Sequence, residues 1–268
     1  MSFLKQKDFL LLLLFIIIFI GIRSIHFADS LNFSSDQAAF SIRAYQIFKN
    51  HELVLLGPPT SINFQGRQIF QGSIIYYFLL LFLLAGKFDP ILSSYIFMLF
   101  CSLMLIPLFI GTKLLINKTS AWFMLIIYTL LPYYIDYTKF LWNPNFKLSL
   151  SPLLILLMGC HKIKQRSILL FFIGALSGLL TQFHFQFFLV ITGLIIYYLF
   201  SLKQKQKILF LILGYFIGLS PILLFEIRNN FYNSKTLILY LTNIHSAVNT
   251  LNDFQNYGHY LLSISFFV

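Results

Sequence analysis

The chain has 268 residues, of which 59% are hydrophobic and 10% are charged, and its mean hydropathy is +0.83. This composition excludes an ordinary water-soluble domain, in which about 25% of residues are charged. The net charge of +11 does not indicate nucleic-acid binding, because the basic residues lie in short clusters between apolar runs.

Apolar runs that approach or reach the length needed to cross a bilayer recur along the chain. Lys5 and Lys7 precede the first run, but no small-residue cleavage site follows it, so we expect a retained signal anchor. The runs predict an all-α fold, a polytopic transmembrane helical bundle with a long first external loop. The candidate spans are 9–27, 91–112, 120–137, 147–160, 168–184, 186–202 and 208–226.

The basic clusters predict how these spans are oriented, because cytoplasmic loops are enriched in Lys and Arg. If segment 72–86 crossed the membrane, strict alternation would place the clusters outside. We therefore expect 72–86 to lie in the interface or to dip partway in, with Gly72 and Gly86 at its ends. The amino terminus is then inside, and the external face collects 28–90, the loop 138–146, His184 and everything from Glu226 onward. The clusters are Lys113 with Lys118, Lys162 with Lys164 and Arg166, and Lys203 with Lys205 and Lys207.

A helix start is predicted in the first external loop, where Ser34 and Gln37 have the spacing of a capping box. Apolar residues at helical intervals follow, which predicts an amphipathic helix flat on the external surface. Asp36 has two interpretations here. It is either a first-turn acid that complements the helix dipole, worth about 0.3–1 kcal/mol, or a carboxylate at the membrane boundary that acts as a general base.

Polar residues also interrupt the later apolar runs. The run from Leu141 through Trp142, Asn143 and Pro144 to Asn145 predicts a compact turn, with Asp136 and Lys139 just before it. A charge at the bilayer centre costs about 2.5–3.5 kcal/mol, so polar residues next to a span usually face a cavity or the interface. The structural interpretations are a turn with an interfacial tryptophan, a helix-end histidine at His184, and an interfacial anchor at Glu226 and Arg228.

The order of these motifs resembles that of the GT-C superfamily of membrane glycosyltransferases, specifically the family 39-like, dolichyl-phosphate-mannose-protein mannosyltransferase-like bacterial enzymes. The resemblance covers nearly the whole chain. Its motifs run from Ser35-Asp36-Gln37 through 56–61 and 70–77 to Trp142-Asn143-Pro144-Asn145, Gln182-Phe183-His184 and Pro221 to Arg228.

The resemblance implies transfer of a sugar from a polyprenyl-phosphate-linked donor to an acceptor hydroxyl of a glycan, lipid or protein, with inversion. Asp36 would be the catalytic base, and Arg228, aided by His184 and Lys139, would stabilise the leaving phosphate. Many relatives carry a second acid where this chain has Gln37, which leaves a divalent cation open. The implied substrate-binding residues are Gln37, Lys139, Trp142, Asn143, Asn145, His184, Glu226 and Arg228.

The resemblance also implies a GT-C-like catalytic module at 1–227, including the external loop 28–90. Residues 228–268 would be an external loop and the start of a further span at 261–268, within a longer protein. The expected location is the inner or plasma membrane, among membrane lipids and with the active site on the external or periplasmic face.

No cofactor is certain from the sequence. Cys101 and Cys160 lie in apolar spans and predict neither a disulfide nor a metal cluster, and no glycine-rich nucleotide fingerprint is present. Two other functions remain open. A transporter or lipid flippase would line a path with intramembrane polar residues, but the inverted repeats that it predicts are not visible. A non-catalytic membrane subunit would bind partners through 28–70.

Overall fold

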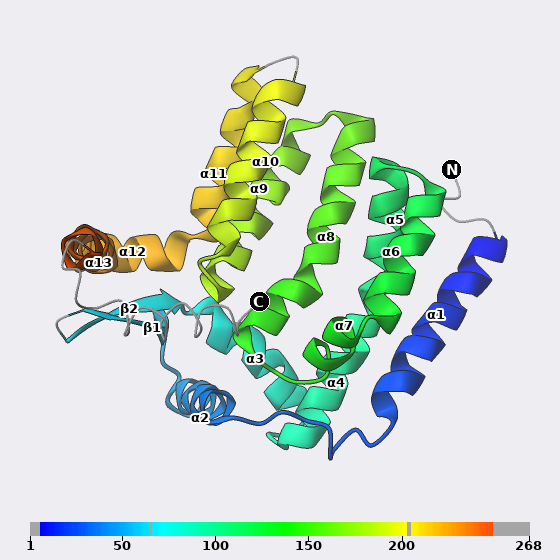
Figure 1. The fold of residues 1–268 in the computed structure, drawn as a ribbon, viewed down its shortest axis with the longest axis horizontal. Helices are drawn as coiled ribbons and strands as arrows, with labels where there is room; N and C mark the ends of the chain where they lie inside the picture. The colour runs from blue at the N-terminus through cyan, green and yellow to red at the C-terminus, as the bar shows by residue number, and fades with distance from the viewer. Residues whose placement is uncertain (1–5, 65, 203–204, 249–268) are drawn as a thin grey trace. The chain divides into compact units, whose positions relative to one another are not determined.

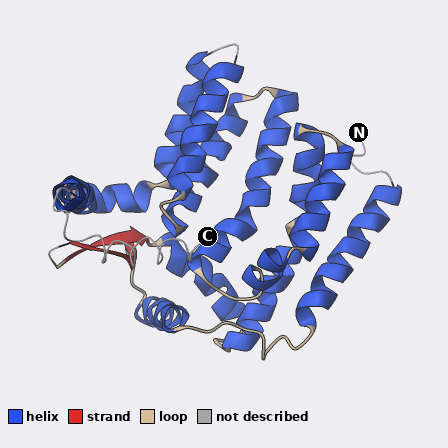
Figure 2. Ribbon diagram, in the orientation of Figure 1, coloured by secondary structure: helices blue, strands red, loops and turns tan. Residues whose placement is uncertain are grey.

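The structure is a computed structural model that describes residues 6–64, 66–202 and 205–248. Most of these residues are helical, and the described strands form one two-stranded ribbon (Figure 1, Figure 2). The prediction of a helical fold is therefore confirmed in its coarse form. The elements are α1 (Gln6–Ser24), α2 (Ser35–Asn50), β1 (Leu56–Phe64), β2 (Arg67–Gly72), α3 (Ile74–Ala85), α4 (Pro90–Leu103), α5 (Leu105–Leu115), α6 (Lys118–Leu130), α7 (Pro132–Tyr137), α8 (Asn143–Lys164), α9 (Ser167–Phe183), α10 (Phe187–Ser201), η1 (Lys205–Lys207), α11 (Ile208–Gly218), α12 (Ser220–Arg228) and α13 (Tyr232–Val248).

Two helical stretches among the described residues are long and apolar enough to cross a membrane, Pro90–Leu115 and Asn143–Lys164. Helices α11 and α12 would add a third if they form one span, although they are bent by 67° at the break between them. Of the other predicted spans, α9 has 17 residues and α10 has 15. Helix length and composition thus support two or three crossings, fewer than the sequence predicted.

Several local predictions were wrong. The predicted turn at 141–145 includes the first turn of α8, with Pro144 near the helix start, where proline is well tolerated. The predicted span 120–137 is broken at Pro132, which has no N–H to continue α6. The polar segment after 227 contains α13, and the first external loop contains the ribbon β1–β2. The span predicted to start at 261–268 lies outside the described residues.

The described chain forms two compact units, residues 6–58 with 71–223 and residues 59–70 with 224–248. In the second unit, the Asn233 side chain lies along the backbone of Phe70. Its Oδ1 accepts from the Phe70 N–H at 3.0 Å, and its Nδ2 donates to the Phe70 carbonyl at 3.1 Å. This pair joins β2 to α13. The predicted division at residue 227 concerns function and stays a prediction.

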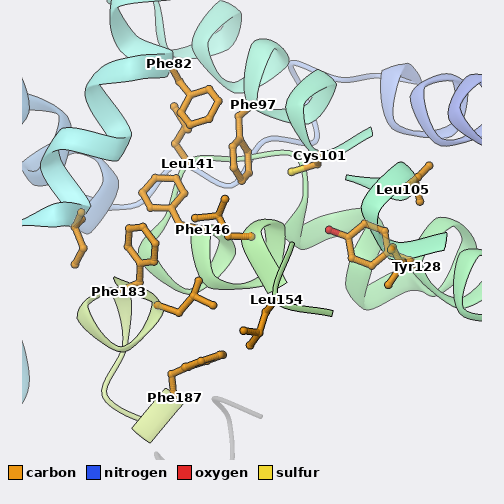
Figure 3. Packing of buried hydrophobic residues seen from close by; sticks show 14 of the residues in the cluster. Phe82, Phe97, Cys101, Leu105, Tyr128, Leu141, Phe146, Leu154, Phe183 and Phe187 are labelled. Atoms are coloured by element: carbon orange, nitrogen blue, oxygen red, sulfur yellow. The ribbon is translucent and has the colours of Figure 1, made fainter. Parts of the chain in front are cut away.

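Phenylalanine rings form one cluster within the mainly aliphatic core of the first unit (Figure 3). Phe82 packs against Phe97 with 5.2 Å between ring centroids, and Phe146 lies 5.6 Å from Phe97 and 5.5 Å from Phe183. These contacts are edge to face, which is a favoured arrangement of aromatic quadrupoles. The cluster joins α3, α4, α8 and α9.

Glycines let α9 and α11 approach at backbone distance. A Cβ on Gly174 would lie 2.0 Å from the Leu211 carbonyl oxygen, and one on Gly214 would lie 2.0 Å from the Phe171 carbonyl oxygen. Gly178 and Gly218 repeat the arrangement one turn further along each helix. Small residues spaced four apart on both partners are typical of packing between membrane helices.

Basic residues from separate segments gather at one end of the first unit, named here the basic end. The buried Asp8 carboxylate of α1 lies 2.6 Å from Lys118 Nζ and 3.8 Å from Lys113 Nζ. Lys162 of α8 donates to the carbonyl of Leu115. Lys207 acts electrostatically on His161, the neighbour of Lys162. Each predicted basic cluster therefore contributes to the same end of the unit.

Candidate functional site

Three loops of the first unit meet at the opposite end of α8, named here the polar end and represented by Ser30, Gln71, Lys139, Asn143 and His184. Lys139 Nζ lies 3.1 Å from Ser30 Oγ. Asn143 Nδ2 donates to Gln71 Oε1 at 2.8 Å and to the Phe183 carbonyl at 3.1 Å. These contacts bring parts of 28–90 and 138–146 together with the residue before His184, while their common location on the external face, with everything from Glu226 onward, stays a prediction.

Helix α3 has both ends at the polar end. Gln71 precedes the helix and bonds Asn143, while Leu83 near its other end lines a pocket with Gln37 of α2 and Pro90 of α4. Its 12 residues would span about 18 Å, less than the ~30 Å of hydrocarbon in a bilayer. Helix α3 is thus too short to cross as one straight span, and whether 72–86 crosses stays a prediction.

Asp36 lies in the first turn of α2, with its side chain exposed. It has no hydrogen bond or ion pair with the described part of the chain, so its carboxylate is open to a ligand. Its neighbour Gln37 is buried and accepts a hydrogen bond from the Ser34 N–H, as the capping box predicted. Gln37 thus holds the helix start, which explains why its side chain is buried. Its role in binding substrate stays a prediction.

A pocket of about 150 Å³ lies beside the start of α2. Gln37 and Ser41 line it from α2, Ser94 from α4, and Phe140 and Leu141 from the segment before α8. None of its lining residues is charged. The pocket therefore suits an apolar or hydroxylated group better than a phosphate.

The residues around the start of α8 are largely committed to structure. Asn143 uses Nδ2 for the two bonds described above, and Asn145 Nδ2 donates to the Phe140 carbonyl at 2.9 Å. The Trp142 ring stacks on Phe140 with 6.3 Å between centroids. These contacts favour the structural interpretation of Trp142, Asn143 and Asn145 over a direct role in binding substrate.

Lys139 is a buried cation whose charge is partly offset. Its Nζ lies 3.4 Å from Asp136 Oδ1, and the Asp136 side chain is exposed. A buried ammonium requires such partners, because desolvation disfavours an isolated charge. Lys139 joins the segment after α7 to the loop after α1, and its predicted contact with the donor phosphate stays a prediction.

His184 follows α9, which ends at Phe183. Burial, aided by the charge of nearby Lys147, lowers the pKa of His184 to about 4. The imidazole is therefore neutral at pH 7 and gains a proton only as the pH falls toward 4. This is evidence against His184 as a fixed positive charge for phosphate, although a neutral imidazole can still donate one hydrogen bond.

Glu226 and Arg228 belong to the second unit. The Glu226 carboxylate accepts from the Asn233 N–H at 2.9 Å, from the Ser234 N–H at 3.0 Å and from Ser234 Oγ at 2.6 Å. It thereby satisfies free donors in the first turn of α13, which explains its burial without substrate. Arg228 is exposed in the last turn of α12, and its role toward phosphate stays a prediction.

Sequence reasoning missed Arg23, which at 1% exposure is the most enclosed Lys or Arg among the described residues of the first unit. Its Nε donates to Thr138 Oγ1 at 2.7 Å, while Nη1 and Nη2 donate to the carbonyls of Thr129 and Tyr128 at 3.1 and 3.2 Å. The signal was available, because an arginine inside the predicted span 9–27 requires a partner.

Within the described residues, no group of three His, Cys, Asp or Glu side chains could hold a metal ion. Gln37, the position at which the sequence left a divalent cation open, is committed to the helix cap. Comparison with protein-family models, curated proteins and solved structures finds no match to this chain.

Proposed function

We propose that the chain is the membrane-embedded part of a glycosyltransferase. It would move a sugar from a polyprenyl-phosphate-linked donor to an acceptor hydroxyl, with inversion. The observation that carries the proposal is the position of Asp36, an exposed carboxylate at the polar end of a unit of apolar helices. A lipid-linked donor needs both surroundings, since its tail stays in hydrocarbon while its sugar phosphate lies at the surface.

The chemistry assigns one role to Asp36. Its carboxylate takes the proton of the acceptor hydroxyl as the hydroxyl oxygen attacks the anomeric carbon. The bond from that carbon to the phosphate oxygen breaks, and its electron pair leaves with the phosphate. Attack opposite the leaving group inverts the anomeric configuration. Fixed cations near the phosphate stabilise the developing charge.

Two features of the first unit support a polytopic membrane arrangement. The glycine contacts between α9 and α11 give the close packing on which membrane helices depend, since lipid supplies no hydrophobic force between them. The basic end lies opposite the polar end along α8, which suits a helix that crosses with positive charge on its cytoplasmic side.

The decisive experiment measures transfer of radiolabelled sugar from a polyprenyl-phosphate donor pool, in membranes that contain the full-length chain, for the parent and Asp36→Asn. Loss of a general base should lower the rate by about a hundredfold or more. The matched control is Asp29→Asn, which changes another exposed carboxylate of the first unit and should leave the rate near that of the parent.

Transfer by Asp36→Asn at the parental rate would remove Asp36 from catalysis. No transfer by the parent over several donors, in membranes where the protein inserts normally, would instead favour a transporter, a flippase or a non-catalytic subunit.

A further inference from the structure

Lys147 shares one face of α8 with Asn143, since the two residues are four positions apart. Asn143 bonds the carbonyl of Phe183, which directly precedes His184. Phe146, the neighbour of Lys147, packs against the Phe183 ring (Figure 3). Lys147 therefore lies on the face of α8 from which Asn143 contacts the residue before His184, and its charge contributes, after burial, to the lowered pKa of His184.

The charge of Lys147 has no acidic partner. Among the described residues, no carboxylate lies within 4 Å of its Nζ, whereas Lys118 has Asp8 at 2.6 Å and Lys139 has Asp136 at 3.4 Å. The side chain is half-buried, so its ammonium has lost part of its hydration without gaining an anion. A bound anion would offset that cost.

His184 adds a donor to the same place. Its Nδ1 accepts a long hydrogen bond, 3.4 Å, from the Gln186 N–H. In the neutral ring the proton then lies on Nε2, which can donate to a ligand. Lys147 and His184 together offer one full positive charge and one neutral N–H.

We infer that Lys147, with His184 beside it, binds the phosphate of the lipid-linked donor, an inference that rests on the proposed function. Lys147 belongs to the same compact unit as Asp36, whereas Arg228 belongs to the other. When the bond from the anomeric carbon to oxygen breaks, the electron pair stays on the phosphate oxygen. The Lys147 ammonium stabilises that charge without giving up its proton, and His184 donates a hydrogen bond to the same group.

The test measures binding of a polyprenyl phosphate to the full chain in phosphatidylcholine nanodiscs. Loss of one charge-assisted contact in Lys147→Met should weaken binding about tenfold or more. Lys147→Arg keeps the charge and should stay within about threefold of the parent. The matched control is Lys87→Met, an exposed lysine of the α3–α4 turn, which should change affinity by less than about twofold.

Three further probes identify the ligand. The polyprenol without phosphate should bind alike to parent and Lys147→Met, and inorganic phosphate should bind weakly to both. Phosphatidylglycerol nanodiscs test the other source of phosphate. If phosphatidylglycerol displaces the polyprenyl phosphate from the parent at equal concentration, the site recognises a headgroup and the assignment to the donor is overturned.

A second readout does not depend on turnover. NMR of histidine-labelled protein should show a higher His184 pKa in Lys147→Met than in the parent, because a nearby positive charge is gone while the burial remains. Equal polyprenyl phosphate binding by parent and Lys147→Met overturns the inference, even if sugar transfer is observed. If binding depends on Lys147 but the parent transfers no sugar, the phosphate site stands and the proposed glycosyltransferase fails.

Discussion

Arg23 shows how a buried charge can stabilise this fold without a carboxylate. Pro132 has no N–H, so the Tyr128 carbonyl four residues earlier lacks its usual helical donor. Arg23 Nη2 donates to this carbonyl at 3.2 Å, and the guanidinium lies 3.4 Å from the centre of the Phe19 ring. A cation is also favourable at the carboxyl end of a helix, here α6. The break at Pro132 and the buried arginine therefore compensate for each other.

Replacing Arg23 should be costly. Arg23→Met removes the charge and its four hydrogen bonds and leaves carbonyls of the last turn of α6 unpaired, so we expect a loss of about 2–4 kcal/mol in unfolding free energy. Thermal unfolding of the detergent-solubilised chain checks this. The control is Arg43→Met, whose surface pair with Glu52 is screened by water and should leave the midpoint close to that of the parent. A similar midpoint for both variants would mean that Arg23 is not a structural tie.

Residue identity could locate polar residues next to apolar runs, but it could not predict the partners of their side chains. Glu226 and Asn143 were singled out correctly as polar residues next to apolar runs, yet their partners, Asn233 with Ser234 and Gln71 with Phe183, depend on how distant segments pack. Lys147 was missed because it stands only two residues after Asn145 and looks like the end of a polar turn. Its unpaired state is visible only in three dimensions.

At the scale of elements, the close contact between α9 and α11 depends on glycines, which have no side chain to hold the two backbones apart. The carbonyl oxygens of Leu211 and Tyr215 occupy the space that Cβ atoms on Gly174 and Gly178 would need, at 2.0 and 2.3 Å. Backbone atoms cannot move aside as a flexible side chain can. Gly193 of α10 contrasts with them, since a Cβ there would meet nothing within 4 Å.

This contrast gives a matched pair of substitutions. Gly174→Ala adds one methyl group against backbone and should destabilise the chain by about 1–3 kcal/mol. Gly193→Ala adds the same methyl in open space and should be neutral or stabilising by up to about 1 kcal/mol, because alanine favours helix. Thermal unfolding of both variants in detergent measures the difference. Equal midpoints would show that α9 and α11 do not pack this closely.

Which elements could be predicted depends on the range of the interactions that form them. Helix α2 was predicted because its start is encoded locally, by Ser34 and Gln37. The ribbon β1–β2 was missed because residues 56–70 belong to a stretch predicted as a non-hydrophobic loop, and hydropathy does not indicate strand pairing. The break between α6 and α7 had a local signal in Pro132, but apolar residues on both sides made 120–137 look continuous.

At the scale of the whole molecule, charge is separated within the first unit. Lys118 and Lys162 lie at the basic end, and Asn143 and His184 lie at the polar end, which contains the loop after α1. The α8 helix, which joins the two ends, has 22 residues. That length corresponds to about 33 Å, enough to cross hydrocarbon.

This separation predicts that the two ends face opposite sides of the membrane. Asp29 and Arg166 are exposed near the polar and basic ends, so Asp29→Cys and Arg166→Cys serve as reporters after Cys101 and Cys160 are replaced by alanine. In intact cells, an impermeant maleimide should label Asp29→Cys only, because cytoplasmic loops carry the lysines and arginines. Arg166→Cys should react once the membrane is permeabilised. Labelling of both from outside would place the two ends on one side, and α8 could not then cross the membrane.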